Sequence, residues 1–329
     1  MEHHELPSDI LFDIFLRLPV KSLLRFRCVS PQWCNIIDDP CLAYTNQIGC
    51  AAEELKVILL DRPTHKPDDV MLREDGGFLK ASLSLVTKLA KSKAYVLEGW
   101  CKGLVCFTKV SDDRLLFLFN PLRQEVLALQ PESPAPSPSL RKRKYGLGFD
   151  SSTNTYKIVR VFESPSHNLC AEVYTLGRSS WRAISSSPPC PLFGRPTFAC
   201  GALHWLASPR VTQVDELEGK IVSFDISKEK FGLISPPKFR SCHLLDLRGD
   251  LAVVDRSSDT HIEIWVMKEY EKKEWVKEYK IDLKPPIGMV DNEMIEVIGV
   301  WELGEILLRY FGSFLSYDPN TGRLRFQGQ

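Results

Sequence analysis

The sequence has no excess of charge of either sign, because 42 lysines and arginines balance 42 aspartates and glutamates. This balance argues against a nucleic-acid binder, which usually carries a basic surface. No stretch approaches 18 uninterrupted apolar residues, and the first seven residues have neither the basic region nor the apolar core of a signal peptide. We therefore expect a protein of the cytoplasm and/or the nucleus.

Motifs for catalysis and for cofactor binding are also missing. The ten cysteines form no Cys-x-x-Cys pair, and the seven histidines never fall at metal-ligand spacing. We expect free thiols, with Cys28, Cys106 and Cys200 acting as small hydrophobic residues, and a packed or rim position for His204. The segment Gly146–Asp150 lacks the third glycine and the lysine of a nucleotide loop, so it predicts a turn. No metal and no cofactor are expected.

The sequence does contain a helical stretch over residues 6–39 in which the starts and ends of the helices are clearly marked. Ser8 predicts the N-cap of a helix over Asp9–Leu18, and Pro19 ends that helix. A second short helix follows, and a third begins with Ser30 as its cap and Pro31 in the first helical position. Helices near ten residues long are unstable alone, so packing must hold the three together.

The helical stretch carries more apolar residues than one buried face needs. One stripe at helical spacing is formed by Ile10, Leu11, Ile14, Phe15 and Leu18. Leu16 and Phe26 lie off the main stripes, and such an excess is typical of a docking surface. The alternative is that these side chains pack on the rest of the chain, and periodicity alone leaves both open.

The order of residues in this stretch resembles the F-box, the adaptor-binding motif of SCF-type ubiquitin ligases. The likeness lies in the opening Leu-Pro-Ser-Asp-Ile, the middle Leu-Arg-Leu-Pro-Val-Lys-Ser-Leu-Leu-Arg-Phe and the close Cys-Val-Ser-x-x-Trp. The positions that match the motif, and that the resemblance assigns to the F-box fold or to contact with a Skp-type adaptor, are Leu6, Pro7, Ile10, Ile14, Leu18, Pro19, Leu23, Arg25, Cys28, Val29, Ser30 and Trp33.

A change of hydrophobic period follows the helices. Residues 46–54 are mostly small and predict a linker between a module at 1–45 and a larger domain at 55–329. Leu55–Leu60 and Phe78–Val86 predict strands, while Arg62–Gly77 is rich in Pro, Asp and Gly and predicts a loop.

The larger domain contains a repeat. An aromatic residue followed by Asp or Asn marks turns at Phe119-Asn120, Phe149-Asp150, Phe224-Asp225 and Tyr317-Asp318. Glycines recur at intervals of 45 to 55 residues, at Gly103, Gly148, Gly201, Gly249 and Gly304. Such periods predict propeller blades of four short strands. Five repeats are visible, and we expect strands near Leu55–Leu60 or Leu79–Val86 to close a ring of about six blades.

These repeats, together with Gly-Trp-Cys-Lys-Gly-Leu-Val at residues 99–105, resemble the plant F-box-associated interaction domain, a kelch-like family joined to an F-box. The resemblance covers residues 95–326. The predicted fold is therefore mainly β, with an N-terminal three-helix F-box followed by a kelch-like β-propeller.

One segment of low complexity interrupts the repeats. Its prolines predict an exposed loop over Pro131–Lys144. Arg141–Lys144 is interpreted as part of a solvated loop, with a nuclear-import signal as the alternative. Ser133 and Ser137, each followed by Pro, are possible phosphate acceptors.

The two resemblances together imply a non-catalytic substrate receptor. The F-box would dock on a Skp-type adaptor and, through it, on cullin and RING subunits, while the propeller would hold an unknown target protein for ubiquitin transfer. Two alternatives are a propeller enzyme, such as a hydrolase or a sugar-acting protein, and an F-box scaffold that acts outside ubiquitination. Convergent histidines or carboxylates on the axial face would favour the enzyme, whereas an aromatic and arginine-lined surface would favour protein binding.

Overall fold

The computed structural model describes most of the helical stretch and most of the larger domain. The described residues are 6–18, 20–37, 57–58, 71–74, 77–79, 95–120, 125–129, 143–208, 219–239, 241–283, 295–300, 304–310 and 313–326. The chain divides into two compact units: the first holds residues 1–57 and 71–82, and the second holds residues 58–70 and 83–329. Within the described residues, no helix is both long and apolar enough to span a membrane.

The first unit contains three short helices, α1 (Ser8–Phe15), α2 (Val20–Phe26) and α3 (Pro31–Ile37). The predicted cap at Ser8 is wrong. Pro7 holds the N-cap position in an extended conformation, and its carbonyl oxygen accepts the N–H groups of Ile10 and Leu11, each at 3.1 Å. The helix begins directly after this proline, so Ser8 is already helical. At α3 the prediction is confirmed, since Ser30 Oγ accepts the backbone N–H of Trp33 at 3.2 Å.

The first helix is also shorter than predicted, because it ends at Phe15 instead of Leu18. The next residues tighten into turns in which the N–H groups of Arg17 and Leu18 reach back only three residues, to Ile14 and Phe15. Pro19, the predicted stop, lies outside the described residues.

A small sheet lies between the helices and the blades in the sequence. Its three strands pair in the order β1 (Val57–Ile58), β2 (Met71–Glu74) and β3 (Gly77–Leu79). The loop predicted over Arg62–Gly77 is therefore partly wrong, because Met71–Glu74 is a strand. The described parts of the two segments expected to close the ring pair in this sheet and not within a blade. The rest of those segments lies outside the described residues.

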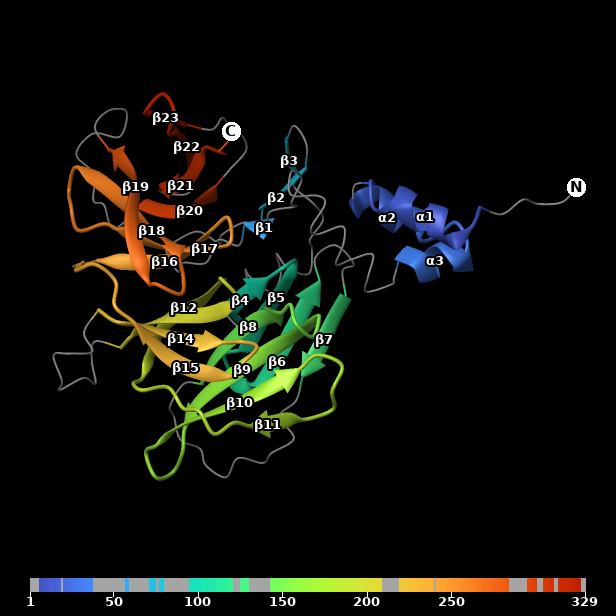
Figure 1. Ribbon diagram of the computed structural model, residues 1–329, viewed down its shortest axis with the longest axis horizontal. Helices are drawn as coiled ribbons and strands as arrows, with labels where there is room; N and C mark the ends of the chain where they lie inside the picture. The colour runs from blue at the N-terminus through green and yellow to red at the C-terminus, as the bar shows by residue number, and fades with distance from the viewer. Residues whose placement is uncertain are drawn as a thin grey trace, which may run out of the picture. The chain divides into compact units, whose positions relative to one another are not determined.

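The second unit is a β-propeller with five four-stranded blades among the described residues, not about six. Figure 1 shows the five sheets in chain order from green to red. Blade 1 contains β4 (Tyr95–Cys101), β5 (Leu104–Lys109), β6 (Asp112–Asn120) and β7 (Glu125–Leu129). Blade 2 contains β8 (Lys144–Asp150), β9 (Thr155–Glu163), β10 (Leu169–Thr175) and β11 (Trp181–Ala183).

The remaining three blades repeat this order. Blade 3 contains β12 (Leu192–Ala199), β13 (Ala202–Ala207), β14 (Ile221–Asp225) and β15 (Lys230–Ile234). Blade 4 contains β16 (Cys242–Leu247), β17 (Asp250–Asp255), β18 (His261–Glu269) and β19 (Glu274–Asp282). Blade 5 contains β20 (Ile295–Val300), β21 (Ile306–Tyr310), β22 (Ser313–Asp318) and β23 (Arg323–Phe326). The first strands contact one another in sequence, β4 to β8, β12, β16 and β20, so they are the inner strands of the blades.

The glycine repeat corresponds to one particular turn. Gly103, Gly201 and Gly249 each stand between the first and second strands of a blade, with φ between 72° and 91°. The residue before each of them also has positive φ, so these are tight hairpin turns that need glycine in the second position. Gly304, at φ 85°, precedes the second strand of blade 5. Gly148 is the exception, because it lies inside strand β8.

The prediction of a turn over Gly146–Asp150 is therefore wrong, and packing explains why glycines stand in this strand. A Cβ atom on Gly146 would lie 2.8 Å from side-chain atoms of Leu203 and Trp205. A Cβ on Gly148 would lie 2.6 Å from Ile226 Cδ1. Both glycines let blade 3 approach the backbone of β8 closely.

The aromatic-Asp turns are confirmed at three of the four marks. Asp150, Asp225 and Asp318 each accept, on Oδ1, the backbone N–H of the residue two positions on, at 2.9–3.0 Å. In blades 3 and 5 this turn joins the third and fourth strands, whereas in blade 2 it joins the first and second. The repeat read from the sequence is thus shifted within blade 2.

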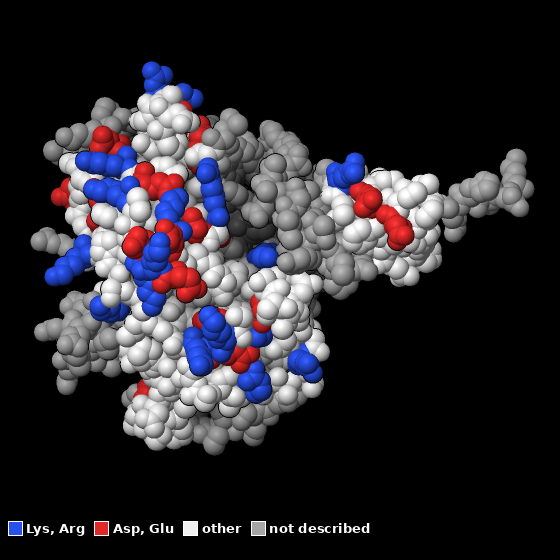
Figure 2. Space-filling view, in the orientation of Figure 1, with Lys and Arg blue, Asp and Glu red and all other residues white. Residues whose placement is uncertain are grey.

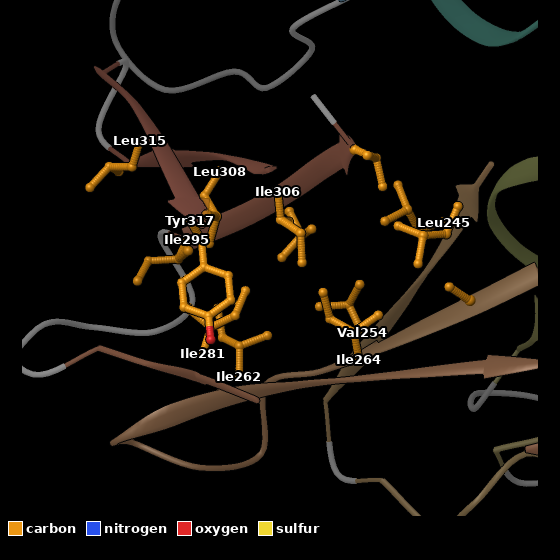
Figure 3. Packing of buried hydrophobic residues seen from close by; sticks show 14 of the residues in the cluster. Leu245, Val254, Ile262, Ile264, Ile281, Ile295, Ile306, Leu308, Leu315 and Tyr317 are labelled. Atoms are coloured by element: carbon orange, nitrogen blue, oxygen red, sulfur yellow. The ribbon is translucent and has the colours of Figure 1, made fainter. Parts of the chain in front are cut away.

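The core lies between blades. Figure 3 shows the cluster between blades 4 and 5, where side chains from both sheets, such as Val254 and Ile306, fill the space between the strands. A second cluster joins blades 2 and 3 around Trp205, which is fully buried. Lys144 opens β8, so the predicted loop over Pro131–Lys144 ends before it. Arg141, Ser133 and Ser137 lie outside the described residues.

Candidate protein-binding surface of the N-terminal helices

The three helices are held together by a small aromatic core. Phe15 lies at the centre, with its ring 5.1 Å from that of Trp33 and 6.4 Å from that of Phe26. Leu11, one turn before Phe15, lies on the same face of α1, and both are at most 3% exposed. Leu23 of α2 and Ile37 of α3 complete the buried set.

A neighbouring face of α1 remains uncovered. Ile10 and Ile14 follow one another at one helical turn, as Leu11 and Phe15 do, but they are 48% and 42% exposed. Leu6, before the helix, is 50% exposed, and Val29, after α2, is 60% exposed. Four exposed aliphatic side chains on one small unit are typical of a surface for protein contact. We call Leu6, Ile10, Ile14 and Val29 the apolar face.

This arrangement corrects the expected division between core and surface. Leu16 and Phe26, expected as the excess, pack against the core of the unit. Ile10 and Ile14, expected on one stripe with Leu11 and Phe15, instead form a face of their own. Periodicity cannot separate the two faces, because adjacent positions on a helix differ by only about 100° and both pairs have the same spacing.

The predicted adaptor-binding residues therefore divide by exposure. Seven are exposed: Leu6, Pro7, Ile10, Ile14, Arg25, Cys28 and Val29. Leu23 is buried, while Leu18, Ser30 and Trp33 are partly buried. Ser30 holds the start of α3, and Trp33 packs in the core. Cys28, expected as a buried small hydrophobic residue, is exposed, whereas Cys106 is fully buried and Cys200 is half-buried.

An acidic groove lies beside α1 and was missed at the sequence level. It has a volume of about 330 Å³ and is lined by Ser8, Asp9, Phe12, Asp13 and Ile36. Figure 2 shows acidic side chains gathered on the visible side of these helices. The signal was present in the sequence, since two aspartates four residues apart share one face of a helix.

In the propeller, one group of buried charges forms ion pairs that connect blades 2 and 3. Lys157 Nζ lies 2.9 Å from Asp150 Oδ2 and 3.0 Å from Glu229 Oε1, and Arg182 also pairs with Glu229. Burial opposes ionisation of Asp150, but hydrogen bonds from Ser152 and Lys157 outweigh it and hold the pKa of this carboxyl well below its usual range. The carboxylates are thus ionised partners of nearby cations.

His204 is a packed histidine, as expected, and joins blades 3 and 4. Its side chain is fully buried, with Nδ1 3.2 Å from the carbonyl oxygen of Thr197 and Nε2 2.8 Å from the hydroxyl of Tyr270. Burial lowers the pKa of His204 to about 4. The neutral ring donates through Nδ1 and accepts the Tyr270 hydroxyl proton through Nε2. Over the described ranges, no three His, Cys, Asp or Glu side chains gather closely enough to hold a metal ion.

Comparisons with known proteins agree with both parts of this architecture. The model of the F-box domain matches residues 4–44, and that of the F-box associated beta propeller domain matches residues 77–325. Similar proteins from Arabidopsis thaliana include F-box protein At3g07870, 28% identical over 97% of this chain and 86% of its own length. F-box/kelch-repeat protein At3g23880 is 26% identical, over 98% of this chain and 90% of its own.

Among solved structures, the acylaminoacyl peptidase of Pyrococcus horikoshii has a TM-score of 0.40 at 13% identity, covering 71% of this chain and 40% of that one. The model of the propeller domain alone spans well over half of the sequence, and the helical unit before it matches the separate F-box model. The chain therefore belongs to the F-box proteins that carry an F-box-associated β-propeller domain.

Proposed function

We propose that the chain is the substrate-recognition subunit of an SCF-type ubiquitin ligase. The F-box would bind a Skp-type adaptor and, through it, cullin and RING subunits, while the propeller would bind the target protein. The observation that carries this proposal is the apolar face on a helical unit that matches the F-box model over residues 4–44. A face of this kind is costly to leave in water and favours a permanent protein partner.

Exposure suggests how the matched residues divide their roles. Leu6, Pro7, Ile10, Ile14 and Val29 would contact the adaptor directly, with Arg25 and Cys28 beside them. Leu18, Leu23, Ser30 and Trp33 would act through the fold, by packing the core or capping α3. Pro19 remains a proposed motif residue that lies outside the described residues.

The proposed role in ubiquitin transfer is non-catalytic. The receptor would raise the local concentration of the target near the ligase, and that proximity supplies the rate increase. We propose no cofactor, a location in the cytoplasm and/or the nucleus, and the domain division 1–45, 46–54 and 55–329. The charged groups between blades 2 and 3 are paired with one another. Such pairing favours a structural role for them over a catalytic role in a propeller enzyme.

Co-expression of the full chain with a plant Skp-type adaptor, followed by size-exclusion chromatography and mass determination, tests the proposal. We expect a 1:1 complex. Ile10→Asp combined with Ile14→Asp should weaken adaptor binding at least 100-fold, because two charges would enter an apolar contact. The matched control is Val276→Asp, since Val276 is equally exposed, at 49%, but lies on β19 of the propeller.

A soluble monomer that ignores the adaptor would refute the proposal. So would equal binding by the wild type and the Ile10/Ile14 variant. An F-box scaffold outside ubiquitination would give the same complex with the adaptor but no ubiquitin transfer to bound protein when cullin and RING subunits are added.

A further inference from the structure

The five blades differ in how their outer strands are protected. The fourth strand of each sheet has a neighbour on one side only, so its other side presents backbone N–H and C=O groups at the edge. These outer strands are β7, β11, β15, β19 and β23. Four of them carry features that hinder pairing with a further strand, and β7 does not.

On two of the outer strands, little of the edge is open. Strand β11 has only three residues. On β15, two backbone groups already bond to side chains from neighbouring blades. The N–H of Phe231 donates to Ser186 Oγ at 2.9 Å, and the carbonyl oxygen of Leu233 accepts a hydrogen bond from Lys273 Nζ at 3.0 Å.

Two further outer strands are protected by charge and by irregular pairing. Strand β19 has two register shifts against β18 and carries Lys277 and Lys280. Strand β23 carries Arg323 and Arg325 among its four residues. Charged side chains and bulges on an edge strand are the usual means by which sheet proteins prevent edge-to-edge pairing.

The outer strand of blade 1, β7, is regular, apolar and open (Figure 1). Its five residues pair with β6 without a register shift, and only the first of them, Glu125, is charged. Val126 and Leu127 are 42% and 47% exposed, and Ala128 is exposed as well. Among the described residues, only those of β6 form backbone hydrogen bonds with this strand. Such an edge is a template for one more strand.

Rows of apolar side chains cross blade 1 and end on β7. One row consists of residues that pair in turn across the four strands, Trp100, Val105, Phe119 and Val126. On the opposite face, Leu127 pairs with Leu118 of β6. Val105, Phe119 and Leu118 are at most 3% exposed, so the rows are buried in the middle of the sheet and exposed on β7. An added strand would continue both rows and cover their exposed ends.

The composition of this edge defines the segment that fits it. Successive residues of a strand point to opposite faces, so an added strand would place one side chain beside Val126 and the next beside Leu127. Because both neighbours are aliphatic, aliphatic side chains at both positions give the best cross-strand contacts. A charged side chain at either position would lose hydration without gaining an opposite charge.

The size of the edge favours a segment of another protein over a second copy of this chain. The five residues of β7 span about 17 Å and a sheet is about 10 Å thick, so the edge presents on the order of 200 Å². A stable interface between two folded proteins needs roughly 600 Å² from each partner. An extended segment needs less, because its main-chain hydrogen bonds supply much of the affinity and it can fold over the exposed sides of Val126 and Leu127.

We propose that β7 binds the target protein by strand addition. An extended, uncharged segment of the target pairs with the outer edge of β7 and places consecutive aliphatic side chains beside Val126 and Leu127. This inference rests on the proposed function as a substrate receptor, and it names the surface and the chemistry by which that receptor recognises its target.

Peptide binding tests strand addition without knowledge of the target. The probes are fluorescein-labelled heptapeptides with Val, Ile or Leu at the three central positions and Ser or Thr at the others. A second set has the same side chains but carries N-methyl groups on the three central amides, which removes the donors that a ladder needs. Fluorescence anisotropy with the full chain should show that the first set binds at least about tenfold more tightly than the second.

Hydrogen–deuterium exchange of the full chain locates the bound peptide. The first set should slow exchange in β7, because its outward amides become hydrogen-bonded, and should leave exchange in β19 and β23 unchanged.

Val126→Lys combined with Ala128→Lys gives β7 two charges at alternate positions, as Arg323 and Arg325 do on β23. This variant should weaken binding of the first set about tenfold. Leu127→Thr, which keeps the preference for a strand but removes part of the aliphatic contact, should weaken it about threefold. The matched control is Val276→Lys, since Val276 is 49% exposed on outer strand β19.

The inference is overturned if the first peptide set does not bind, if both sets bind equally, if exchange slows elsewhere but not in β7, or if the β7 variants bind like Val276→Lys. Sedimentation equilibrium of the full chain provides a further test. A dimer that Val126→Lys with Ala128→Lys converts to a monomer would place a second copy at this edge and overturn the inference.

Adaptor binding is measured on the same variants. Loss of the adaptor complex with retained peptide binding would refute the receptor function alone, whereas retained adaptor binding without peptide binding would refute strand addition alone.

Discussion

The helical unit and the propeller differ in how completely they bury their apolar residues. Among the described residues, the helices bury four apolar side chains in one cluster, Leu11, Phe15, Leu23 and Ile37. The cluster between blades 4 and 5 alone buries sixteen. A unit of about 40 residues buries too little surface to be very stable alone, yet this one leaves Ile10 and Ile14 in solvent.

The difference shows where each unit depends on a partner. In the propeller, buried clusters join blade 2 to blade 3, blade 3 to blade 4 and blade 4 to blade 5, so exposed apolar side chains outside these clusters can change with little effect on folding. In the helices, the exposed and the buried apolar residues alternate along α1, and the fold and the surface share eight residues of one helix. Residues that stabilise the fold and residues that form the exposed surface are therefore adjacent in the first unit and well separated in the second.

Alanine substitutions at two adjacent positions of α1 test this difference between the units most directly. Phe15→Ala should destabilise the helical unit by about 3–5 kcal/mol, because it empties the centre of a small aromatic core. Ile14→Ala, one residue away but 42% exposed, should cost less than about 0.5 kcal/mol. Hydrogen–deuterium exchange of α1 to α3 in the full chain measures both, and only Phe15→Ala should remove protection from all three helices.

The outcome for the blades serves as the internal control. Exchange in strands such as β13 and β17 should be the same in both variants, because the two units have separate cores. Equal loss of protection in Ile14→Ala would mean that the apolar face is part of the core, and the case for a docking surface there would fail.

The division into a helical unit and a bladed domain could be predicted from the sequence, and the predictions that were wrong have physical causes. The repeat of glycines and aromatic-Asp turns predicted the blades, because tight turns demand particular backbone angles that few residues adopt. Gly146 and Gly148 were misjudged because close packing of another blade also selects glycine, and a sequence does not show what lies across an interface. The predicted number of blades was too high, since strands β1, β2 and β3 pair in a separate three-stranded sheet.

The helical surface could be predicted only in outline. The F-box motif marked the right stretch, but residues of the motif serve both the fold and the surface, and order along the chain does not separate them. Leu23 is buried and Val29 is 60% exposed, although both match the motif. Only the packing of Phe15, Phe26 and Trp33 decides which side of each helix is covered.

The pH dependence of stability should also differ between the two units, because the propeller contains the buried His204. Burial lowers the pKa of His204 to about 4, against 6.5 for a free histidine. The unfolded chain therefore binds more protons between these values, so this group reduces the stability of the folded state as pH falls from 6.5 to 4. The loss amounts to roughly 3 kcal/mol at pH 4 relative to pH 7.

Urea unfolding of the wild type and of His204→Gln over this pH range measures that loss. The variant should show a flatter decline, because it no longer takes up this proton. The helical unit contributes no described histidine, so its exchange rates should not follow the same titration. Parallel curves for the wild type and His204→Gln would contradict the burial of a neutral ring.

The smallest of these effects tests the close approach of blades 2 and 3. Gly148→Ala should destabilise the propeller by about 1–3 kcal/mol, because the added methyl group would meet Ile226, which is fully buried and cannot move aside. Gly99→Ala is the matched control, since its Cβ has nothing nearer than Pro196 at 3.8 Å, and it should change stability by less than about 0.5 kcal/mol. The midpoint of urea unfolding, followed by tryptophan fluorescence, separates the two variants. Equal midpoints would show that blade 3 can withdraw from β8, and the propeller would then be less tightly closed between these blades than its fully buried Trp205 and Ile226 indicate.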